Sequence, residues 1–168
     1  MCYNGGMEQV IYDIANKNDI DELVRLRIAY MYDDLGELSE CDEKAMREHL
    51  PGYYERELGD HLIAFVARAE GRIVATAYLL ITEKPANPSM PNGLCGEVMS
   101  VFTEDAYRGK GICTHLMNDL ISCGKELKLS RIDLLATGDG YHVYEKVGFK
   151  EKHLHYTDMR LDLTPHTP

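Results

Sequence analysis

The stretch Tyr107-Arg108-Gly109-Lys110-Gly111-Ile112-Cys113-Thr114 decides our interpretation of the chain, because it joins an expected strand to an expected helix. Upstream, residues 96–102 (Gly-Glu-Val-Met-Ser-Val-Phe) are typical of a β-strand, and downstream apolar residues recur with a helical period from Ile112 to Leu127. Two glycines at such a turn let the backbone approach a ligand closely. The N–H groups and the positive dipole end of a helix favour a phosphate. We therefore expect a phosphate-bearing cofactor at this turn.

Better-known phosphate loops do not account for the motif. The chain has no Gly-x-x-x-x-Gly-Lys-Ser/Thr loop. The dinucleotide-binding fingerprint requires a small residue where Thr114 stands, and no suitable acidic residue ends the next strand. A nucleotide-binding transferase is therefore a weaker alternative. The remaining pattern, Arg-x-x-Gly-x-small from Arg108 to Cys113, also fits an ordinary strand–helix connection.

Composition limits the classes of protein that the chain can belong to. Its 168 residues suit one domain with a substantial core, and its formal net charge of −10 argues against partners such as nucleic acid or an anionic membrane. Five cysteines without a CxxC pair predict neither a disulfide framework nor a zinc site, so we expect a cytoplasmic location. No signal peptide or membrane span is predicted. We expect residues 1–8 to be a flexible N-terminus and residues 9–168 to form a single domain.

Seven segments have the alternation or short apolar runs of β-strands: residues 10–15, 62–69, 72–82, 96–102, 132–136, 149–153 and 159–163. Helical periodicity is expected in residues 19–31, 43–50, 53–58, 111–129 and 141–147. Asp19 and Glu22 resemble a capping box at the first helix, and residues 33–43 are expected to be an acidic link. Pro51-Gly52 is expected to interrupt the second helix. These elements predict an α+β (mixed α/β) fold with a central twisted mixed sheet flanked by helices.

A second motif favours a functional role for the glycine turn over an ordinary strand–helix connection. Tyr144-Glu145-Lys146-Val147-Gly148-Phe149 follows one strand and one turn later. With both motifs in this order, the sequence resembles the GNAT superfamily of N-acetyltransferases over nearly the whole chain, from Val10 to Leu163. The resemblance implies the GNAT-like acyl-CoA N-acyltransferase fold, with acetyl-CoA or coenzyme A as cosubstrate and its pyrophosphate at the glycine turn. Cys113 departs from the Gly or Ala usual in the family, and the link between residues 101 and 108 is longer than the commonest version.

The resemblance also assigns two catalytic roles. Tyr144 matches the family tyrosine that protonates the departing thiolate; alternatively, it is a packed aromatic that anchors the last helix. Glu97 is the candidate general base, since an attacking amine must lose a proton; alternatively, it is an exposed glutamate at a strand end. Strand alternation predicts that Glu97, Met99 and Val101 share one face.

Most cofactor-binding assignments use backbone groups. By resemblance, Val101, Phe102 and Thr103 pair with the pantetheine arm, while Leu135, Ala136 and Thr137 form the facing edge of a splayed strand pair. Phe102 is equally suited to a core position, and Lys110 to a solvated loop. The predicted cofactor-binding set is Val101, Phe102, Thr103, Arg108, Gly109, Lys110, Gly111, Ile112, Cys113, Thr114, Ala136 and Thr137.

The implied reaction moves an acetyl group to a primary amine of a small molecule or peptide. Direct transfer in a ternary complex is expected, because no cysteine lies in a motif that activates a nucleophile. Acidic residues such as Asp33 and Asp34 either form a solvated link or attract a cationic amine. No metal site is expected, since His153 and His155 have no third ligand. Family members are often homodimers. The alternative function is a non-catalytic acyl-CoA-binding sensor or partner module.

Overall fold

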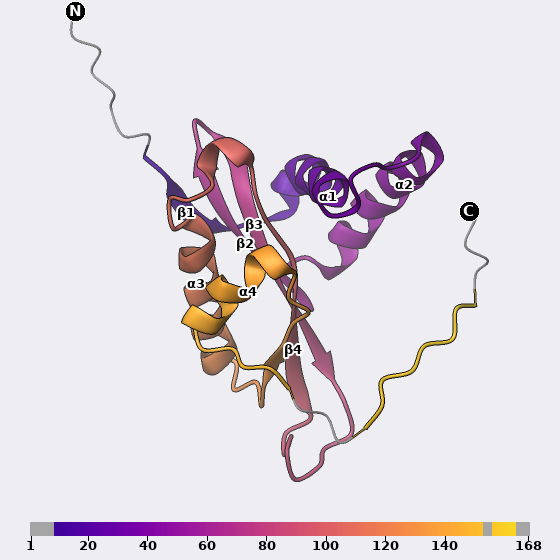
Figure 1. Cartoon of the computed structure of the whole chain (residues 1–168), viewed down its shortest axis with the longest axis vertical. Coiled ribbons are helices and arrows are strands. Elements are labelled where there is room, and N and C mark those ends of the chain that lie inside the picture. The colour runs from indigo at the N-terminus through magenta and orange to yellow at the C-terminus, as the bar shows by residue number, and fades with distance from the viewer. Residues whose placement is uncertain (1–8, 153–155, 164–168) are drawn as a thin grey trace, which may run out of the picture.

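A five-stranded mixed sheet in the order β1-β2-β3-β4-β5 forms the centre of the protein (Figure 1). The computed structural model describes residues 9–152 and 156–163. The strands are β1 (Ile11–Ile14), β2 (Leu62–Ala69), β3 (Arg72–Glu83), β4 (Leu94–Thr103) and β5 (Ile132–Asp133). The first four pair antiparallel, and β5 pairs parallel to β4. The predicted flexible N-terminus, residues 1–8, lies outside the described residues.

Helices cover both faces of the sheet. Figure 1 shows α1 (Ile20–Leu35) and α2 (Glu40–Glu57) on one face, with α3 (Ile112–Glu126) and α4 (Gly138–Lys146) on the other. Short 3₁₀ turns at Lys17–Asp19 and Asp105–Tyr107 precede α1 and the glycine turn. The predicted α+β fold is confirmed, and most predicted element boundaries agree with the structure to within a few residues.

Alternation along β2 shows how the sheet separates two cores. Leu62, Ala64 and Val66 pack on the side of α1 and α2, whereas Phe65 and Ala67 pack on the side of α3. Successive side chains of a strand point to opposite faces. A strand buried on both faces is therefore apolar throughout, as residues 62–67 are.

Helix α2 corrects the predicted interruption at Pro51-Gly52, because it continues from Glu40 to Glu57. A proline removes one helical hydrogen bond, here to the carbonyl of Arg47, which is exposed and can bind water instead. Tyr54, only 1 % exposed, fixes the second half of the helix to the core, and its hydroxyl lies 3.2 Å from that of Tyr78. The acidic link is also shorter than predicted, since α1 runs to Leu35 and α2 begins at Glu40.

The start of α1 corrects the predicted capping box. Asp19 occupies the N-cap position, but its side chain makes no cap hydrogen bond to α1. Its carboxylate accepts two hydrogen bonds of 2.9 Å from Arg68 on β2, while Asn16 and Asp19 form the capping box of the preceding 3₁₀ turn. The predicted partner Glu22 accepts hydrogen bonds from Arg25 instead.

A bulge in β4 corrects the prediction that Glu97, Met99 and Val101 share a face. Met99 pairs with Tyr78 and Phe102 with Thr76, so β4 has one more residue than β3 across this interval. Ser100 has a φ of 50°, a conformation uncommon for residues other than glycine. An extra residue reverses the alternation beyond it. Met99 accordingly packs beside α1 and α2, while Val101 packs on the α3 side.

The chain after α4 is not strand where it is described. Residues 149–152 and 159–163 were predicted within strands but make no ladder. Met159, Leu161 and Leu163 are 82–87 % exposed. Alternating apolar residues form a strand only when a neighbouring strand supplies hydrogen bonds and a buried face, and within the described residues no strand pairs with this segment. β5 likewise ends at Asp133 rather than at residue 136.

Candidate active site

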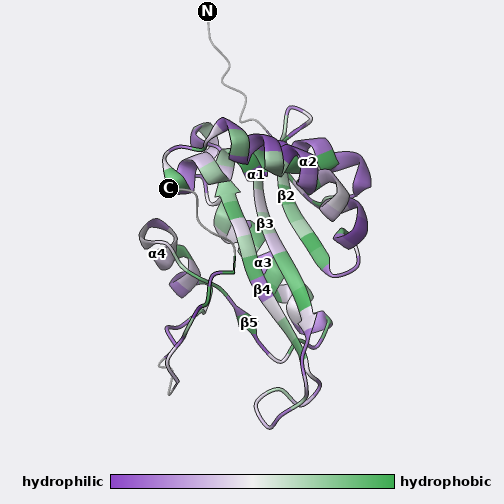
Figure 2. Ribbon diagram, turned by 90° about the vertical axis from the view of Figure 1, so that its right-hand side faces the viewer, coloured by the Kyte–Doolittle hydropathy of each residue, from purple (hydrophilic) through white to green (hydrophobic). Residues whose placement is uncertain are grey.

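A cavity of about 790 Å³ lies between the C-terminal half of α1, strand β4 and the chain that follows β5. β4 and β5 pair only at Gly96–Ile132 and Glu97–Asp133, and beyond that point their chains diverge (Figure 2). Residues of both diverging chains line the cavity. Its wall includes nine of the predicted site residues: Glu97, Val101, Phe102, Thr103, Arg108, Gly109, Cys113, Thr137 and Tyr144.

The glycine turn has the backbone geometry that the sequence predicts. Gly109 and Gly111 have φ values of 72° and 79°, which side-chain-bearing residues rarely adopt. Helix α3 begins directly after Gly111, and no side chain of the described residues caps it. Its first-turn N–H groups therefore remain available to an anion. Ile112 is 2 % exposed, and its side chain packs in the core with Leu116 and Leu120.

Arg108 is held by neighbouring groups at one end of the cavity. Its guanidinium lies 3.0 Å from an Asp33 carboxylate oxygen and 3.1 Å from one of Asp105. It also donates a 2.8 Å hydrogen bond to the carbonyl of Thr103 and lies over the ring of Phe102. This arginine thereby joins the end of α1 to the glycine turn.

The β4 bulge lies in the cavity wall and is held from both sides. Thr76 Oγ1 donates a 2.9 Å hydrogen bond to the carbonyl of Ser100, and Arg27 Nη1 donates a 2.8 Å bond to Ser100 Oγ. Ser100 is 5 % exposed. A bulge leaves a backbone group outside the strand ladder. Ser100 and Val101 both line the cavity, so an N–H group that the bulge leaves outside the ladder is a candidate donor to an oxyanion.

Tyr144 lies on α4 and contacts both the cavity and a neighbouring groove. Burial, with smaller contributions from Cys113 and Tyr30, raises the pKa of Tyr144 to about 12. Its phenol is therefore protonated at neutral pH. Its ring also packs edge-on against Phe149 at 6.3 Å, so the tyrosine has a structural contact as well.

Two further groups bear on the mechanism. Burial raises the pKa of the Cys113 thiol, which therefore stays protonated at neutral pH and is a weak nucleophile. Glu97 is exposed on β4 and contributes to the cavity wall. Asp33 and Asp34, in the last turn of α1, line the same cavity.

Some predicted residues lie elsewhere. Ala136 lines the neighbouring groove, and the cavity lining does not include Lys110, Gly111, Ile112 or Thr114. Lys110 Nζ lies 5.0 Å from the centre of the Tyr107 ring. Arg27, Tyr30 and Ser100 also line the cavity, although the sequence motifs do not predict them as site residues. A signal existed for Arg27, because a charged residue interrupts the apolar stripe of the first helix.

Within residues 9–152 and 156–163, no group of three His, Cys, Asp or Glu side chains is placed to hold a metal ion. His153 and His155 lie outside the described residues. No described helix is both long and apolar enough to cross a bilayer.

Comparison with known proteins agrees with this geometry. The family model of the acetyltransferase (GNAT) family matches residues 24–149, which include β4, the glycine turn, Tyr144 and Phe149. The chain belongs to the GNAT family. The predicted family and fold are thereby confirmed.

Similar proteins are named as acetyltransferases. A crystal structure of a predicted acetyltransferase with acetyl-CoA from Clostridium acetobutylicum has a TM-score of 0.79 at 27 % identity, covering 90 % of this chain and 96 % of that one. A glucosamine 6-phosphate N-acetyltransferase of Trypanosoma brucei brucei is 31 % identical over 101 residues, 59 % of this chain and 63 % of that protein. A probable glucosamine 6-phosphate N-acetyltransferase 2 of Oryza sativa subsp. japonica is 29 % identical, covering 70 % of this chain and 72 % of that protein.

Proposed function

We propose that this protein is an acetyl-CoA-dependent N-acetyltransferase that moves an acetyl group to a primary amine by direct transfer. The observation that carries the proposal is the single cavity shared by the β4 bulge, Tyr144 and part of the glycine turn. Family membership and a structural relative crystallised with acetyl-CoA support the cosubstrate.

The cofactor would extend from the glycine turn into the space between the diverging strands. The first-turn N–H groups of α3 would bind the pyrophosphate, and the exposed backbone of Gly109 and Gly111 leaves room for it. The pantetheine arm would run beside Val101 and Thr103, facing Thr137 across the cavity. The thioester would then lie near Ser100 and Tyr144.

The reaction needs one proton removed and one supplied. A neutral amine forms a bond to the thioester carbonyl carbon, and the resulting oxyanion accepts a backbone N–H hydrogen bond at the bulge. The C–S bond then breaks and the sulfur takes a proton from the Tyr144 hydroxyl. Desolvation that raises the pKa of Tyr144 also raises the proton affinity of the leaving thiolate, so the two remain compatible.

Glu97 is the proposed base, acting directly or through water. It lies on the α1 side of β4 with Met99, before the bulge reverses the alternation. Tyr144 comes from the other wall of the cavity, across the divergence of β4 and β5. Base and acid would therefore approach the thioester from opposite sides. The raised pKa of Cys113 supports direct transfer over a thioester intermediate on the protein.

The acceptor is proposed to be a small amine. Asp33 and Asp34 lie at the C-terminal end of α1, where the helix dipole disfavours carboxylates. Asp33 pairs with Arg108 at 3.0 Å, so Asp34 is the carboxylate that we expect to attract an ammonium group to the cavity. Arg27 adds a positive charge to the same wall, so an amine that also carries an anionic group fits the site. The two relatives named for glucosamine 6-phosphate act on a molecule of this kind.

A paired binding and turnover experiment tests the proposal. Acetyl-CoA and coenzyme A should raise the melting temperature, because a ligand that binds only the folded state stabilises it. Free thiol should then be released from acetyl-CoA with a panel of glucosamine 6-phosphate, cationic diamines, amino acids and peptides. Thiol release with one amine class and matching N-acetyl product would support an enzyme. Stabilisation without turnover across the panel would favour the acyl-CoA-binding module.

A further inference from the structure

Thr76 of β3 is a buried polar side chain that touches the β4 bulge from outside the cavity. Its Oγ1 donates a 2.9 Å hydrogen bond to the carbonyl of Ser100, and the cavity lining includes Ser100 and Val101 but not Thr76. Apart from tyrosine and cysteine, Thr76 and Ser100 are the only buried residues with polar side chains in the part of the chain that the structure describes. A buried hydroxyl needs a hydrogen-bond partner, and Thr76 finds its partner in the bulge.

The backbone of Ser100 has to be held in place by its surroundings. Residues with side chains rarely adopt a φ of 50°, and such a conformation persists where neighbouring contacts fix it. Arg27 bonds to the Oγ of Ser100, which can rotate about its own χ1 bond, whereas Thr76 bonds to the backbone carbonyl. Thr76 therefore sets the direction of the peptide group that joins Ser100 to Val101.

This peptide group connects the Thr76 contact to the cavity. In a trans peptide the C=O and the following N–H lie in one plane and point in opposite directions. β4 lies between β3 and β5, so a Ser100 carbonyl that bonds to Thr76 points toward β3, and the N–H of Val101 points toward the β5 side. β5 pairs with β4 only as far as Glu97. The Val101 N–H is thereby directed into the space between the two diverging chains.

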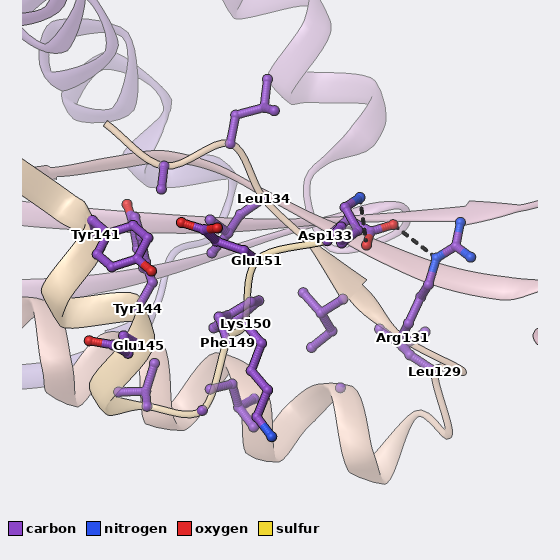
Figure 3. A pocket seen from close by; sticks show the side chains of 18 of the residues that line it. Leu129, Arg131, Asp133, Leu134, Tyr141, Tyr144, Glu145, Phe149, Lys150 and Glu151 are labelled. Carbon is purple, nitrogen blue, oxygen red and sulfur yellow. Dashed lines mark hydrogen bonds and ion pairs between the residues drawn. The ribbon is translucent and has the colours of Figure 1, made fainter. Parts of the chain in front are cut away.

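The proposed acid approaches the same space from its other wall. Leu134 follows β5 and Tyr144 lies on α4, and both line the cavity as well as the neighbouring groove beside β5 (Figure 3). A thioester has two atoms that need a proton or a hydrogen bond during the transfer, its carbonyl oxygen and its sulfur. The Val101 N–H from β4 would serve the oxygen, and the Tyr144 hydroxyl from α4 would serve the sulfur.

We propose that Thr76 is a positioning residue for acetyl transfer, because it fixes the peptide whose Val101 N–H donates to the thioester carbonyl oxygen. This inference rests on the proposed function. As the amine nitrogen bonds to the carbonyl carbon, the oxygen gains negative charge, and the charge is lost again when the C–S bond breaks and the sulfur takes the Tyr144 proton. A donor that is fixed before the reaction needs no reorientation as this charge develops. Thr76 itself touches no reacting atom.

The first test compares two substitutions of Thr76. Thr76→Val removes the hydroxyl at nearly unchanged volume and should lower kcat by about tenfold or more, since loss of a whole oxyanion donor costs about a hundredfold or more. The rise in melting temperature caused by coenzyme A should not change. Thr76→Ser keeps the hydroxyl and should restore most of kcat. A wild-type kcat in Thr76→Val, or equal losses in both variants, would overturn the proposal.

The matched control is a second threonine of β3. Thr82 also contacts β4, with its Oγ1 3.1 Å from the Sγ of Cys95, but it does not line the cavity. Thr82→Val should keep a kcat close to wild type. A loss of kcat in Thr82→Val as large as in Thr76→Val would attribute the effect to the general packing of β3 against β4, against the proposal.

The second test is an NMR measurement that does not depend on turnover. In the ¹⁵N-labelled, unsubstituted chain without amine, acetyl-CoA should move the Val101 amide proton further downfield than coenzyme A does, because only acetyl-CoA has the thioester carbonyl. Thr76→Val should reduce this difference and leave the amide shifts of the glycine turn in place. Equal responses of the Val101 amide to both ligands in the unsubstituted chain would overturn the proposal, whether or not Thr76→Val folds. If no amine releases thiol but the Val101 difference depends on Thr76, the proposed function fails and the placement of this N–H by Thr76 is supported.

Discussion

Tyr144 lies on α4 and lines the candidate active-site cavity, where it is the proposed general acid. The short motif around it fixes its position on α4, and burial in the cavity wall raises its pKa to about 12. Tyr144→Phe should lower turnover by about a hundredfold, the lower end of the range for one acid–base group, with little change in cofactor affinity. On the alkaline side, the wild-type rate should fall as the pH approaches the raised pKa of the Tyr144 phenol.

A neighbouring tyrosine provides the control for that experiment. Tyr141 lies on the same helix but lines the neighbouring groove beside β5 and not the candidate active-site cavity. Tyr141→Phe should leave turnover close to wild type. If both phenylalanine variants lose activity equally, or neither does, Tyr144 serves as a packing residue of α4 against Phe149.

Glu97 can be separated from a merely exposed glutamate by its effect on pH dependence. A carboxylate base gives a rate that rises as it ionises. Glu97→Gln should lower the rate by about tenfold or more and move the rising limb toward higher pH, with unchanged coenzyme A affinity. Glu83→Gln, at the exposed end of β3, is the control. An unchanged pH profile in Glu97→Gln would assign the base to another residue or to water.

The identity of Ser100 does not predict the bulge that the structure has at this position of β4. A serine at a φ of 50° carries no local signal, since such conformations are associated with glycine. It is stabilised by Thr76 on β3 and Arg27 on α1, which lie 24 and 73 residues away. Long-range contacts of this kind become visible only once the helix and the strands are packed.

At the level of elements, local signals predicted the hairpin of β2 and β3 and the glycine turn before α3. Both depend on neighbouring residues: glycines at positive φ and an alternating or helical apolar period. Helix α2 shows the opposite case, because burial of Tyr54 outweighs the local cost of Pro51. The predicted strand at residues 159–163 has the right alternation, but no strand of the described part of the chain pairs with it.

The N-terminus of α3 is the proposed binding site of the cofactor pyrophosphate, and a substitution at Gly111 tests it. Gly111→Val should abolish the rise in melting temperature caused by coenzyme A, because a branched side chain blocks the approach of phosphate to the helix end. Strain at positive φ should also cost stability, on the order of 1–3 kcal/mol. Gly59→Val controls for that cost, since Gly59 has a φ of 86°, open surroundings and a place after α2. Equal coenzyme A stabilisation in both variants would place the pyrophosphate elsewhere.

Across the whole molecule, some carboxylates form ion pairs between elements and others line the candidate active-site cavity. Partly buried ion pairs join elements: Arg68 links β2 to the start of α1, and Arg25 links α1 to Glu104 after β4. In the last turn of α1, Asp33 and Asp34 both line the cavity, and Asp33 also pairs with Arg108. Net charge and composition predicted an acidic protein without a nucleic-acid partner, but only the fold separates structural carboxylates from those lining the site.

The Asp19–Arg68 pair yields a prediction about stability and pH. Hydrogen bonds from Arg68 hold the pKa of Asp19 below its ordinary value of 3.8, despite partial burial. The folded state therefore binds this proton less tightly than the unfolded state. The contribution of the pair to the free energy of unfolding is thus complete above about pH 4 and is lost as pH falls through the folded pKa.

Asp19→Asn should lower the free energy of unfolding at pH 7 by about 2 kcal/mol, as expected for charged hydrogen bonds. Urea titrations between pH 7 and 3 should show a shallower acid loss in this variant than in wild type. Asp21→Asn, an exposed change on the same helix, should retain the wild-type slope. A wild-type slope in Asp19→Asn would mean that other carboxylates, such as Glu22, govern the acid stability of the protein.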